Sequence, residues 1–593
     1  MFQTFEAQSS PKQGPPRLRA LRAEMAQRGI DAFLVPRADA HQGEYVAPRD
    51  ARLEWLTGFS GSAGFCAVLA EVAGVFIDGR YRVQVRSQVA DDFTPVNWPE
   101  AQLADWLPSQ LMTGVLAYDP WLHTVSEVEG LRRDMPQLTL NPTENLVDLI
   151  WSDQPPAPTE PFKAHMLEHA GELHAAKRAR LAAELKQDVA VLTLPDSIAW
   201  LLNIRGTDIA RNPVPQSFAI LRKSGHVDLF AGPGKAGNIQ EHLGSDVTLH
   251  DISDFLDVLK GLNGSVLIDG RTCPDIVATA LSDAGCEVVQ GKDPCILPKA
   301  CKNPVEIAGS KAAHTRDAVA MVRFLAWLDA QGPDAGLTEI DVVTALEGFR
   351  TRTNALRDIS FETICGAGPN GAIVHYRVSE DTNRALAQSE LLLVDSGGQY
   401  IDGTTDITRT MAIGNSTAEH QRCYTRVLQG MIAVSRIRFP HGVGGQHLDA
   451  LARAPLWLAG QDYDHGTGHG VGSYLSVHEG PQGISRRSEV ALQQGMILSN
   501  EPGYYREGAF GIRIENLIVV VEAPALAGAD DRQMLAFETL TYVPFDRRLI
   551  DTSLLSTKER HWIDGYHADT LHLLEPLLAT SDCDWLTRAC APL

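Results

Sequence analysis

The feature that most constrains the fold is a run of four prolines within eleven residues, SDQPPAPTEPF, at positions 152–162. Proline lacks a backbone N–H and fixes its own φ angle, so this run cannot continue a helix or lie in a central strand. At 593 residues the chain is also too long for one ordinary domain. We therefore expect a linker here, with separate domains on either side.

The segments before and after the proline run show the same order of predicted elements. Before it, RLRALRAEMAQRGI predicts an amphipathic helix, DAFLVPR a buried strand and FCAVLAEVAGVFIDGRY a hairpin. After it, HAAKRARLAAELKQ and DVAVLTLP again predict helix and strand, and the string around Trp200 parallels that around Trp55. The tripeptide Asp78-Gly79-Arg80 of the first segment recurs in the second as Asp269-Gly270-Arg271. We interpret this as a domain duplication with an insertion; chance similarity of short apolar strings is the alternative.

A long amphipathic helix opens a third domain. It begins with Asn303 and Pro304, which suit the N-cap and first-turn positions. Its apolar face carries Ala318, Met321, Val322, Leu325 and Leu328. The sequence thus predicts an α/β (α+β) protein with domains at 1–153, 154–302 and 303–593.

The charge and the apolar patterning exclude two classes of partner. A net charge of -22 repels phosphate backbones and anionic membrane surfaces. No stretch approaches the roughly 18 apolar residues of a membrane span, and the start has no signal-peptide pattern. Nine cysteines without a Cys-x-x-Cys pair indicate neither a disulfide framework nor a thiolate zinc site. We expect a cytoplasmic protein that binds neither nucleic acid nor membranes.

Four acidic residues of the third domain end or interrupt apolar strands. Asp395 and Asp406 lie in LLLVDSGGQYIDGTTDITRTMAIG, two β-rich runs around a glycine-rich bend, so both can face one cavity. Glu501 and Glu515 lie in ILSNEPGYY and AFGIRIENLIVVV, and strand alternation places Arg513 on the same side as Glu515. Charges in such places need a cation or a hydrogen-bonded partner. Taken singly, the acids could also be turn caps or members of structural ion pairs.

A glycine-rich string, HGTGHGVGSYLSVHEGP, carries His465, His469 and His478. The intervening Gly-Thr-Gly favours a loop or strand over a helix, so we expect one metal ligand and not a pair at helical spacing. A surface loop is the alternative. Together, four carboxylates and one histidine suit a pair of Mn²⁺, Co²⁺, Fe²⁺ or Zn²⁺ ions, and such a pair performs hydrolytic chemistry.

These strings resemble the pita-bread metallopeptidase family, in particular its three-domain cytosolic aminopeptidase P (Xaa-Pro aminopeptidase) branch. The family's ligand order of Asp, a second Asp eleven residues later, His, Glu and Glu corresponds to Asp395, Asp406, His469, Glu501 and Glu515. The strings GPNGAIVHY, VHEGP and LTYVPFDRRLID are also similar, and the resemblance covers essentially the whole chain. It implies two related creatinase-like α/β domains followed by a C-terminal pita-bread catalytic domain.

The resemblance also implies an activity, a cofactor and partners. The activity is hydrolysis of the N-terminal Xaa-Pro bond of peptides by a hydroxide that bridges two divalent ions. Mn²⁺ is the first choice of metal, with Co²⁺ or Zn²⁺ as alternatives. The partners are peptides with proline in the second position and a second copy of the chain in a homodimer. The two N-terminal domains are expected to cap the groove and provide a recess for the free amine.

Roles for single residues follow from the same resemblance. Glu501 shuttles a proton to the leaving proline nitrogen. His375 and His478 hold the substrate and the developing oxyanion, and His465 lines the pocket near the substrate. Arg513 orients Glu515 and the loop acids.

Several other functions fit the sequence less well. A prolidase would share the metal site but lack the extra N-terminal domain, and a creatinase-like enzyme would lack the ligands. A non-catalytic pita-bread binding protein is the alternative from a different class. GAGPNG matches the dinucleotide-binding glycine pattern, but it contains a proline and the following AIVHYRV predicts a strand, so we reject a Rossmann site.

Overall fold

The structure is a computed structural model that describes residues 1–7, 10–332 and 335–593. The chain forms two compact units, one of Gln8–Lys299 and one of Met1–Ala7 with Ala300–Leu593. No helix among the described residues is both long enough and apolar enough to cross a bilayer. The cysteines in this part of the chain are all free thiols, and most of them are buried.

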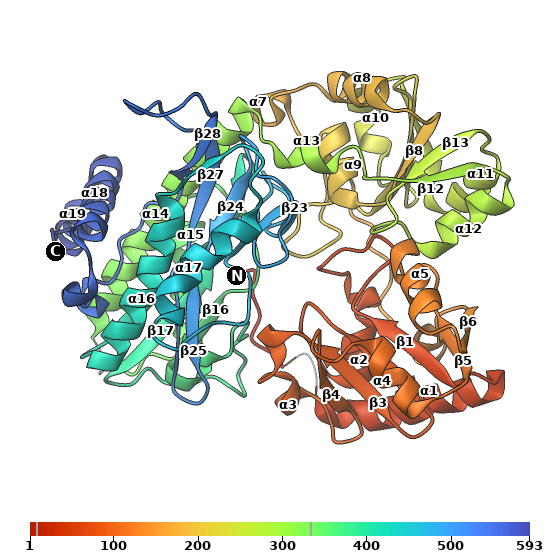
Figure 1. The fold of residues 1–593 in the computed structure, drawn as a ribbon, viewed down its shortest axis with the longest axis horizontal. Helices are drawn as coiled ribbons and strands as arrows, with labels where there is room; N and C mark the ends of the chain where they lie inside the picture. The colour runs from red at the N-terminus through yellow and green to blue at the C-terminus, as the bar shows by residue number, and fades with distance from the viewer. Residues whose placement is uncertain (8–9, 333–334) are drawn as a thin grey trace. The chain divides into compact units, whose positions relative to one another are not determined.

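The unit Gln8–Lys299 contains two six-stranded sheets with the same strand order (Figure 1). The first runs β4-β3-β2-β1-β5-β6, and the second runs β12-β11-β10-β8-β13-β14. In each, three neighbouring strands pair antiparallel and the others pair parallel, in matching positions. The strands are β1 Ala32–Pro36, β2 Phe65–Leu69, β3 Ala73–Ile77, β4 Thr94–Asn97, β5 Gly114–Tyr118, β6 Leu138–Pro142, β8 Val189–Leu192, β10 Ser217–Arg222, β11 Val227–Ala231, β12 Val247–Asp251, β13 Ser265–Ile268 and β14 Glu287–Gln290. The two N-terminal folds therefore share one strand order, which confirms the prediction that they are related.

The helices of the two folds also correspond. Helix α1 (Gly14–Arg28) precedes β1, and α8 (His174–Glu184) precedes β8. Trp55 lies on α2 (Arg52–Thr57) after β1, and Trp200 lies on α9 (Pro195–Leu202) after β8. The two tryptophans therefore occupy equivalent places, as their similar sequence contexts predict.

The two Asp-Gly-Arg tripeptides, in contrast, do not occupy equivalent positions in the two folds. Asp78 follows β3, whereas Asp269 follows β13, which corresponds to β5. The counterpart of Asp269 is Asp119 at the end of β5. Asp119 accepts a hydrogen bond from the N–H of Trp121 at 2.9 Å, and Asp269 accepts one from the N–H of Arg271 at 3.0 Å. The same turn recurs at both places, although the residues after the aspartate differ.

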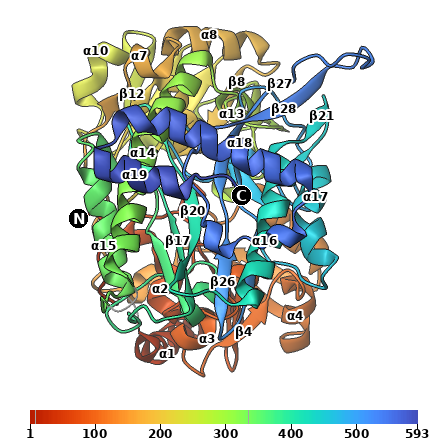
Figure 2. The ribbon, with the colours of Figure 1, turned by 90° about the vertical axis from the view of Figure 1, so that its left-hand side faces the viewer.

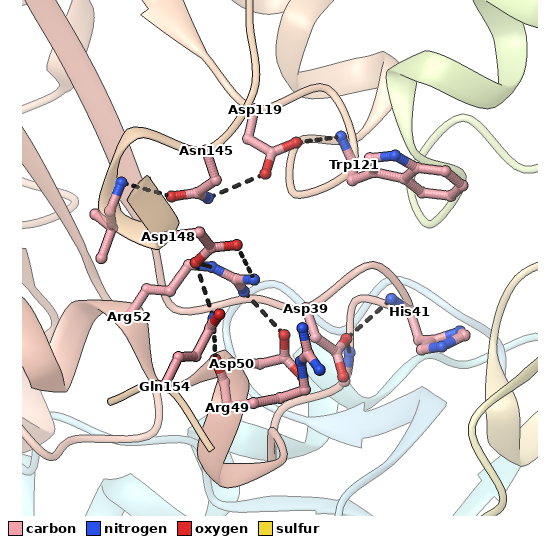
Figure 3. A network of polar contacts seen from close by, with 12 residues as sticks. Asp39, His41, Arg49, Asp50, Arg52, Asp119, Trp121, Asn145, Asp148 and Gln154 are labelled. Carbon is pink, nitrogen blue, oxygen red and sulfur yellow. Dashed lines mark hydrogen bonds and ion pairs between the residues drawn. The ribbon is translucent and has the colours of Figure 1, made fainter. Parts of the chain in front are cut away.

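A buried arginine ties the start of the proline run to the first fold (Figure 3). Arg52 binds Asp148 through two hydrogen bonds of 2.7 and 2.8 Å and Asp50 through one of 2.9 Å. Asp148 also accepts a hydrogen bond from Gln154 at 2.9 Å. The proline run itself forms neither helix nor strand, as expected.

The second unit is built around α14 (Pro304–Gln331). Asn303 caps it by accepting from the N–H groups of Val305 and Glu306, and the Glu306 carboxylate accepts in return from the Asn303 N–H. The predicted start of this helix is confirmed. Its apolar face, with α15 (Glu339–Thr351), packs against β16 (Ile364–Ala367), β17 (Glu390–Ser396) and β20 (Ile407–Ile413).

Further sheets and helices complete this unit. A six-stranded sheet has the order β21-β28-β27-β24-β22-β23, and β25 (Gly503–Arg506) pairs with β26 (Phe510–Arg513). Its strands are β21 Arg438–Pro440, β22 Gly468–Gly470, β23 Glu479–Ile484, β24 Ile497–Asn500, β27 Asn516–Glu522 and β28 Met534–Thr539. Helices α16 (Ala418–Ser435) and α17 (Gly445–Trp457) pack together. Helices α18 (Thr557–Leu574) and α19 (Thr580–Ala589) pack on α14 as the outer layer at the front of Figure 2.

Candidate metal centre

Two aspartates are positioned by the antiparallel pair β17 and β20. Asp395 lies in β17 opposite Thr408 of β20, and Asp406 lies one residue before β20 begins. The bend between them forms two short strands, β18 (Gly398–Tyr400) and β19 (Gly403–Thr404), which join a separate sheet. Asp406 was predicted inside the second strand and instead lies just ahead of it. Both carboxylates are buried, as the prediction of a shared cavity requires.

His469 and Glu501 come from neighbouring strands of the six-stranded sheet. His469 lies in β22, not on a helix, and Glu501 directly follows β24. The Ser499 hydroxyl accepts from the His469 N–H at 2.9 Å and donates to Glu501 Oε1 at 3.0 Å. His469 Nδ1 lies 2.9 Å from the Gly470 carbonyl oxygen, which assigns the proton to Nδ1. Nε2 is then free to bind a cation, 3.5 Å from Asp406 and 3.4 Å from Glu501.

Glu515 lies in the short break between β26 and β27. The sequence predicted one continuous strand here, but β26 and β27 belong to different sheets. Arg513 and Glu515 nevertheless face the same side, as predicted from their alternation. Arg513 binds Asp395 at 2.6 Å, and the Thr408 hydroxyl donates to Glu515 at 2.7 Å. Arg513 also donates to that hydroxyl at 3.3 Å, so Arg513 and Thr408 connect two of the acids.

Three carboxylate oxygens in this cluster are buried without a hydrogen-bond donor. They are Asp395 Oδ1, Asp406 Oδ1 and Glu515 Oε1. Buried polar atoms are nearly always partnered, so this group calls for a cation. Ligand atoms from Asp406, His469 and Glu515 all lie within 4.8 Å of one another. Hard oxygen donors with one imidazole are the ligands that divalent ions such as Mn²⁺ and Zn²⁺ accept, so the residues fit such ions.

The electrostatics of the acids lead to the same conclusion. Burial, and then the neighbouring carboxylates, raise the pKa of Asp406 and of Glu515 well above the usual range. Burial also raises the pKa of Glu501. The negative charges therefore destabilise one another unless a cation balances them.

The other predicted histidines lie around this cluster in different ways. The ring of His478 lies 4.1 Å from that of His469, at 73° to it. His465 Nε2 lies 2.9 Å from the Tyr505 hydroxyl. His375 lies on a turn in which the preceding Val374 carbonyl accepts from Arg513 at 3.3 Å.

The segment around His375 corrects one prediction. AIVHYRV forms no strand; a short 3-10 helix, Gly368–Ala372, leads into the turn, and only Arg377 makes an isolated bridge, to Ile364. The backbone turns here instead, because the Ile373 N–H donates to the Asn370 carbonyl at 3.1 Å and the Tyr376 N–H donates to the Ile373 carbonyl at 3.0 Å.

Sequence reasoning missed three residues that hold the site together: Thr408, Ser499 and Tyr505. The Tyr505 hydroxyl lies between His465 and Arg513, 2.5 Å from the guanidinium. Burial raises the pKa of Tyr505 to about 12, so it stays a neutral phenol. Thr408 and Ser499 each lie two residues from a predicted ligand, which is the spacing of side chains on one face of a strand. That spacing could have identified both.

Comparisons with known proteins identify the family. Residues 308–522 match the metallopeptidase family M24, and residues 533–593 match the C-terminal region of such peptidases. Residues 17–150 and 153–306 each match a creatinase/prolidase N-terminal domain. These matches confirm the predicted fold class, two creatinase-like domains followed by a catalytic domain of the pita-bread metallopeptidases.

Relatives match over nearly the whole chain. Aminopeptidase P1 of Lotus japonicus is 37% identical over 97% of this chain and 99% of its own. A probable Xaa-Pro aminopeptidase P of Aspergillus fumigatus is 39% identical over 97% of this chain and 92% of its own.

Solved structures agree. The X-prolyl aminopeptidase of Caenorhabditis elegans, described as a cytosolic enzyme with a di-nuclear active site, has a TM-score of 0.91 and 33% identity, and the match covers 98% of this chain and 99% of that one. A Xaa-Pro dipeptidase of Bacillus anthracis shares the fold over 63% of this chain and 98% of its own, with 24% identity and a TM-score of 0.51. The chain therefore belongs to metallopeptidase family M24, in its aminopeptidase P group.

Proposed function

We propose that this protein removes the N-terminal residue from peptides with proline in the second position, with the help of two divalent metal ions. The observation that carries the proposal is the set of three buried carboxylate oxygens without donors, on Asp395, Asp406 and Glu515. They lie where His469 and Glu501 also converge. Relatives named as probable Xaa-Pro aminopeptidases, matched over more than nine tenths of their length, support the choice of substrate.

The metal ligands in this proposal are Asp395, Asp406, His469, Glu501 and Glu515. Mn²⁺ is the first choice of ion, with Co²⁺ or Zn²⁺ as alternatives, because four carboxylates and one imidazole suit each of them. When bound, such ions lower the pKa of water to give a nucleophile at neutral pH and polarise the scissile carbonyl. The di-nuclear site named for the Caenorhabditis elegans relative supports two ions.

Glu501 is proposed to hold the proton that the leaving group needs. Amide hydrolysis releases an amine, so the proline nitrogen must gain a proton as the bond breaks. The Ser499 hydroxyl holds one oxygen of Glu501 at 3.0 Å, which fixes the carboxylate for this transfer. Glu501 is thus a ligand and a proton carrier.

The remaining polar residues are proposed to orient the substrate and the ligands. His375 and His478 hold the substrate and stabilise the negative charge that develops on its carbonyl oxygen. His465 lines the pocket near the substrate, where Tyr505 connects it to Arg513. Arg513 holds Asp395 directly, and it reaches Glu515 through the Thr408 hydroxyl.

We extend the proposal to the whole protein. The domains run over 1–153, 154–302 and 303–593, and the enzyme is a cytoplasmic homodimer. The cytosolic description of the Caenorhabditis elegans relative supports the location. Size-exclusion chromatography with light scattering tests the oligomeric state.

Peptide cleavage tests the proposed activity. The purified protein is incubated with Arg-Pro-Pro, Arg-Ala-Ala and the dipeptide Arg-Pro, each with and without manganese. Released arginine from Arg-Pro-Pro, but not from Arg-Ala-Ala, is the expected result. Cleavage of Arg-Pro alone would favour a prolidase, and metal binding without any cleavage would favour a non-catalytic binding protein.

A further inference from the structure

Arg409 is a fully buried arginine on the reverse side of the strand that leads away from Asp406. It lies in β20, where side chains alternate between the two faces. Thr408 and Thr410 face the metal centre, since Thr408 donates to Glu515 and Thr410 donates to the Arg513 carbonyl at 3.0 Å. Arg409 therefore points away from the proposed ions.

The guanidinium of Arg409 joins four segments of the chain. Nη1 donates to the carbonyl oxygens of Thr408 at 2.9 Å and Glu515 at 2.6 Å. Nη2 donates to Asn516 Oδ1 at 2.8 Å, to the Val543 carbonyl at 2.7 Å and to the Tyr566 hydroxyl at 3.1 Å. Within the described chain these acceptors are all neutral oxygens. A buried charge is costly unless its donors are satisfied, and here the guanidinium is held by hydrogen bonds to several segments at once.

Glu515 is the proposed ligand whose backbone Arg409 contacts directly. It lies in the break between β26 and β27, outside either strand ladder. Its N–H donates to the Thr408 carbonyl at 3.1 Å, and its carboxylate accepts from the Thr408 hydroxyl. Arg409 donates to the carbonyl oxygens of both Thr408 and Glu515. It therefore fixes the backbone on both sides of the hydrogen bonds between these two residues.

The same guanidinium reaches the C-terminal region. Val543 lies in the segment that follows β28, and Tyr566 lies on α18, in the outer helical layer of Figure 2. The Tyr566 hydroxyl also accepts from the Val543 N–H at 3.0 Å and donates to the Thr541 carbonyl at 3.0 Å. The C-terminal region is thereby connected to the backbone of Glu515 through one side chain.

We propose that Arg409 is a positioning residue of the metal centre, which holds Glu515 in place and makes metal affinity depend on the packing of the C-terminal region through Tyr566. This inference rests on the proposed function, in which Glu515 is a metal ligand. Groups that orient metal ligands typically change affinity or activity by about 10–100-fold when they are removed. Arg409 acts through Glu515 and touches no substrate.

The test compares metal affinity in matched variants. Arg409→Lys keeps the positive charge but cannot bridge the β20 and C-terminal carbonyls at the same time. We expect Mn²⁺ binding to the metal-free variant, measured by calorimetry, to weaken by about 10-fold or more for at least one ion. Turnover of Arg-Pro-Pro should return to near the wild-type kcat at saturating Mn²⁺, because Arg409 does not touch the substrate.

The control is Arg52→Lys, which alters a buried, forked arginine in the other unit. It should lower Tm but leave Mn²⁺ affinity at the wild-type value. Arg409→Lys protein that binds both ions with wild-type affinity would overturn the proposal. If Arg409→Lys does not fold, Tyr566→Phe removes one acceptor of the guanidinium, together with the hydroxyl's bonds to Val543 and Thr541, and should weaken Mn²⁺ binding in the same direction by a smaller factor. Unchanged affinity in Tyr566→Phe would then overturn the coupling. Wild-type protein that binds no divalent ion would instead refute the proposed function.

Discussion

At the scale of single residues, metal ligands and catalytic histidines should behave differently when they are replaced. Asp395 and His469 lie inside the cluster of carboxylates, so Asp395→Asn and His469→Ala should lower metal occupancy. His375→Ala and His478→Ala should keep the metal yet lose on the order of 10²-fold in kcat, typical of removing an oxyanion or proton-transfer partner. Metal content, Tm and kcat are measured on the same preparations.

A purely structural role for the two histidines gives a different result. If they only brace loops, their alanine variants should have a lower Tm and nearly normal kcat. A His478→Ala protein with near-normal kcat would remove that residue from the mechanism. The close contact of the His478 ring with His469 makes this variant the more informative of the two.

The raised pKa values of the acids predict how the stability of the metal-free protein depends on pH. Asp406 and Glu515 have pKa values well above the usual range because burial and their neighbours disfavour the charged form. A raised carboxyl pKa stabilises the fold below the unfolded value of about 4, and this contribution is lost as pH rises through the folded pKa. The Tm of metal-free protein should therefore fall relative to metal-loaded protein as pH rises above about 4 and through the raised pKa values of these two acids.

Scanning calorimetry of both forms in matched buffers measures this difference. Metal-loaded protein is the control, because bound cations balance the same charges. A gap between the two Tm values that stays constant or narrows as pH rises would contradict the prediction.

At the scale of elements, a buried ion pair connects the segment before α14 to β23. Lys302 and Glu479 form this pair with both side chains fully buried, and Glu479 directly follows His478. Removing one partner of a buried pair typically costs about 3–5 kcal/mol, because the other charge stays buried. Lys302→Met should lose about that much in denaturant unfolding, whereas Lys302→Met/Glu479→Leu should recover most of it. A single variant as stable as the wild type would contradict this.

The elements that the sequence predicts well are those with local causes. Asn303 with Glu306 forms the capping box of α14, and the apolar run before Asp395 is a buried strand, β17. Both follow from neighbouring residues alone. The spacing of the family's metal ligands then identifies residues that lie far apart in the sequence. Among them, Asp406, His469, Glu501 and Glu515 lie close together in the structure.

The elements that the sequence predicts poorly depend on distant pairings. Glu515 interrupts a run that looks like one strand, because β26 pairs with β25 while β27 pairs with β24 and β28. The link from Tyr505 to His465 and Arg513 joins three separate strings, and no local pattern contains it. The recurring Asp-Gly-Arg tripeptide is a further case in which the local sequence misleads. Only the strand order reveals that Asp119, and not Asp78, is the counterpart of Asp269.

At the scale of the whole molecule, an aminopeptidase should require a free N-terminal amine. N-acetylated Arg-Pro-Pro should therefore be a poor substrate compared with the free peptide at the same concentration. Mass spectrometry of the products measures the positions of cleavage. Efficient internal cleavage of a long, N-blocked proline peptide would contradict an exopeptidase.

The central claim, a two-metal hydrolase, is tested most directly by titrating metal-free protein with Mn²⁺ while turnover of Arg-Pro-Pro is followed. Four carboxylates exceed what one small divalent ion needs, so activity should rise with occupancy and reach its maximum at about two ions per chain. Chelation should then abolish turnover, and Mn²⁺ should restore it. Full turnover in protein that elemental analysis shows to be free of metal would contradict the account.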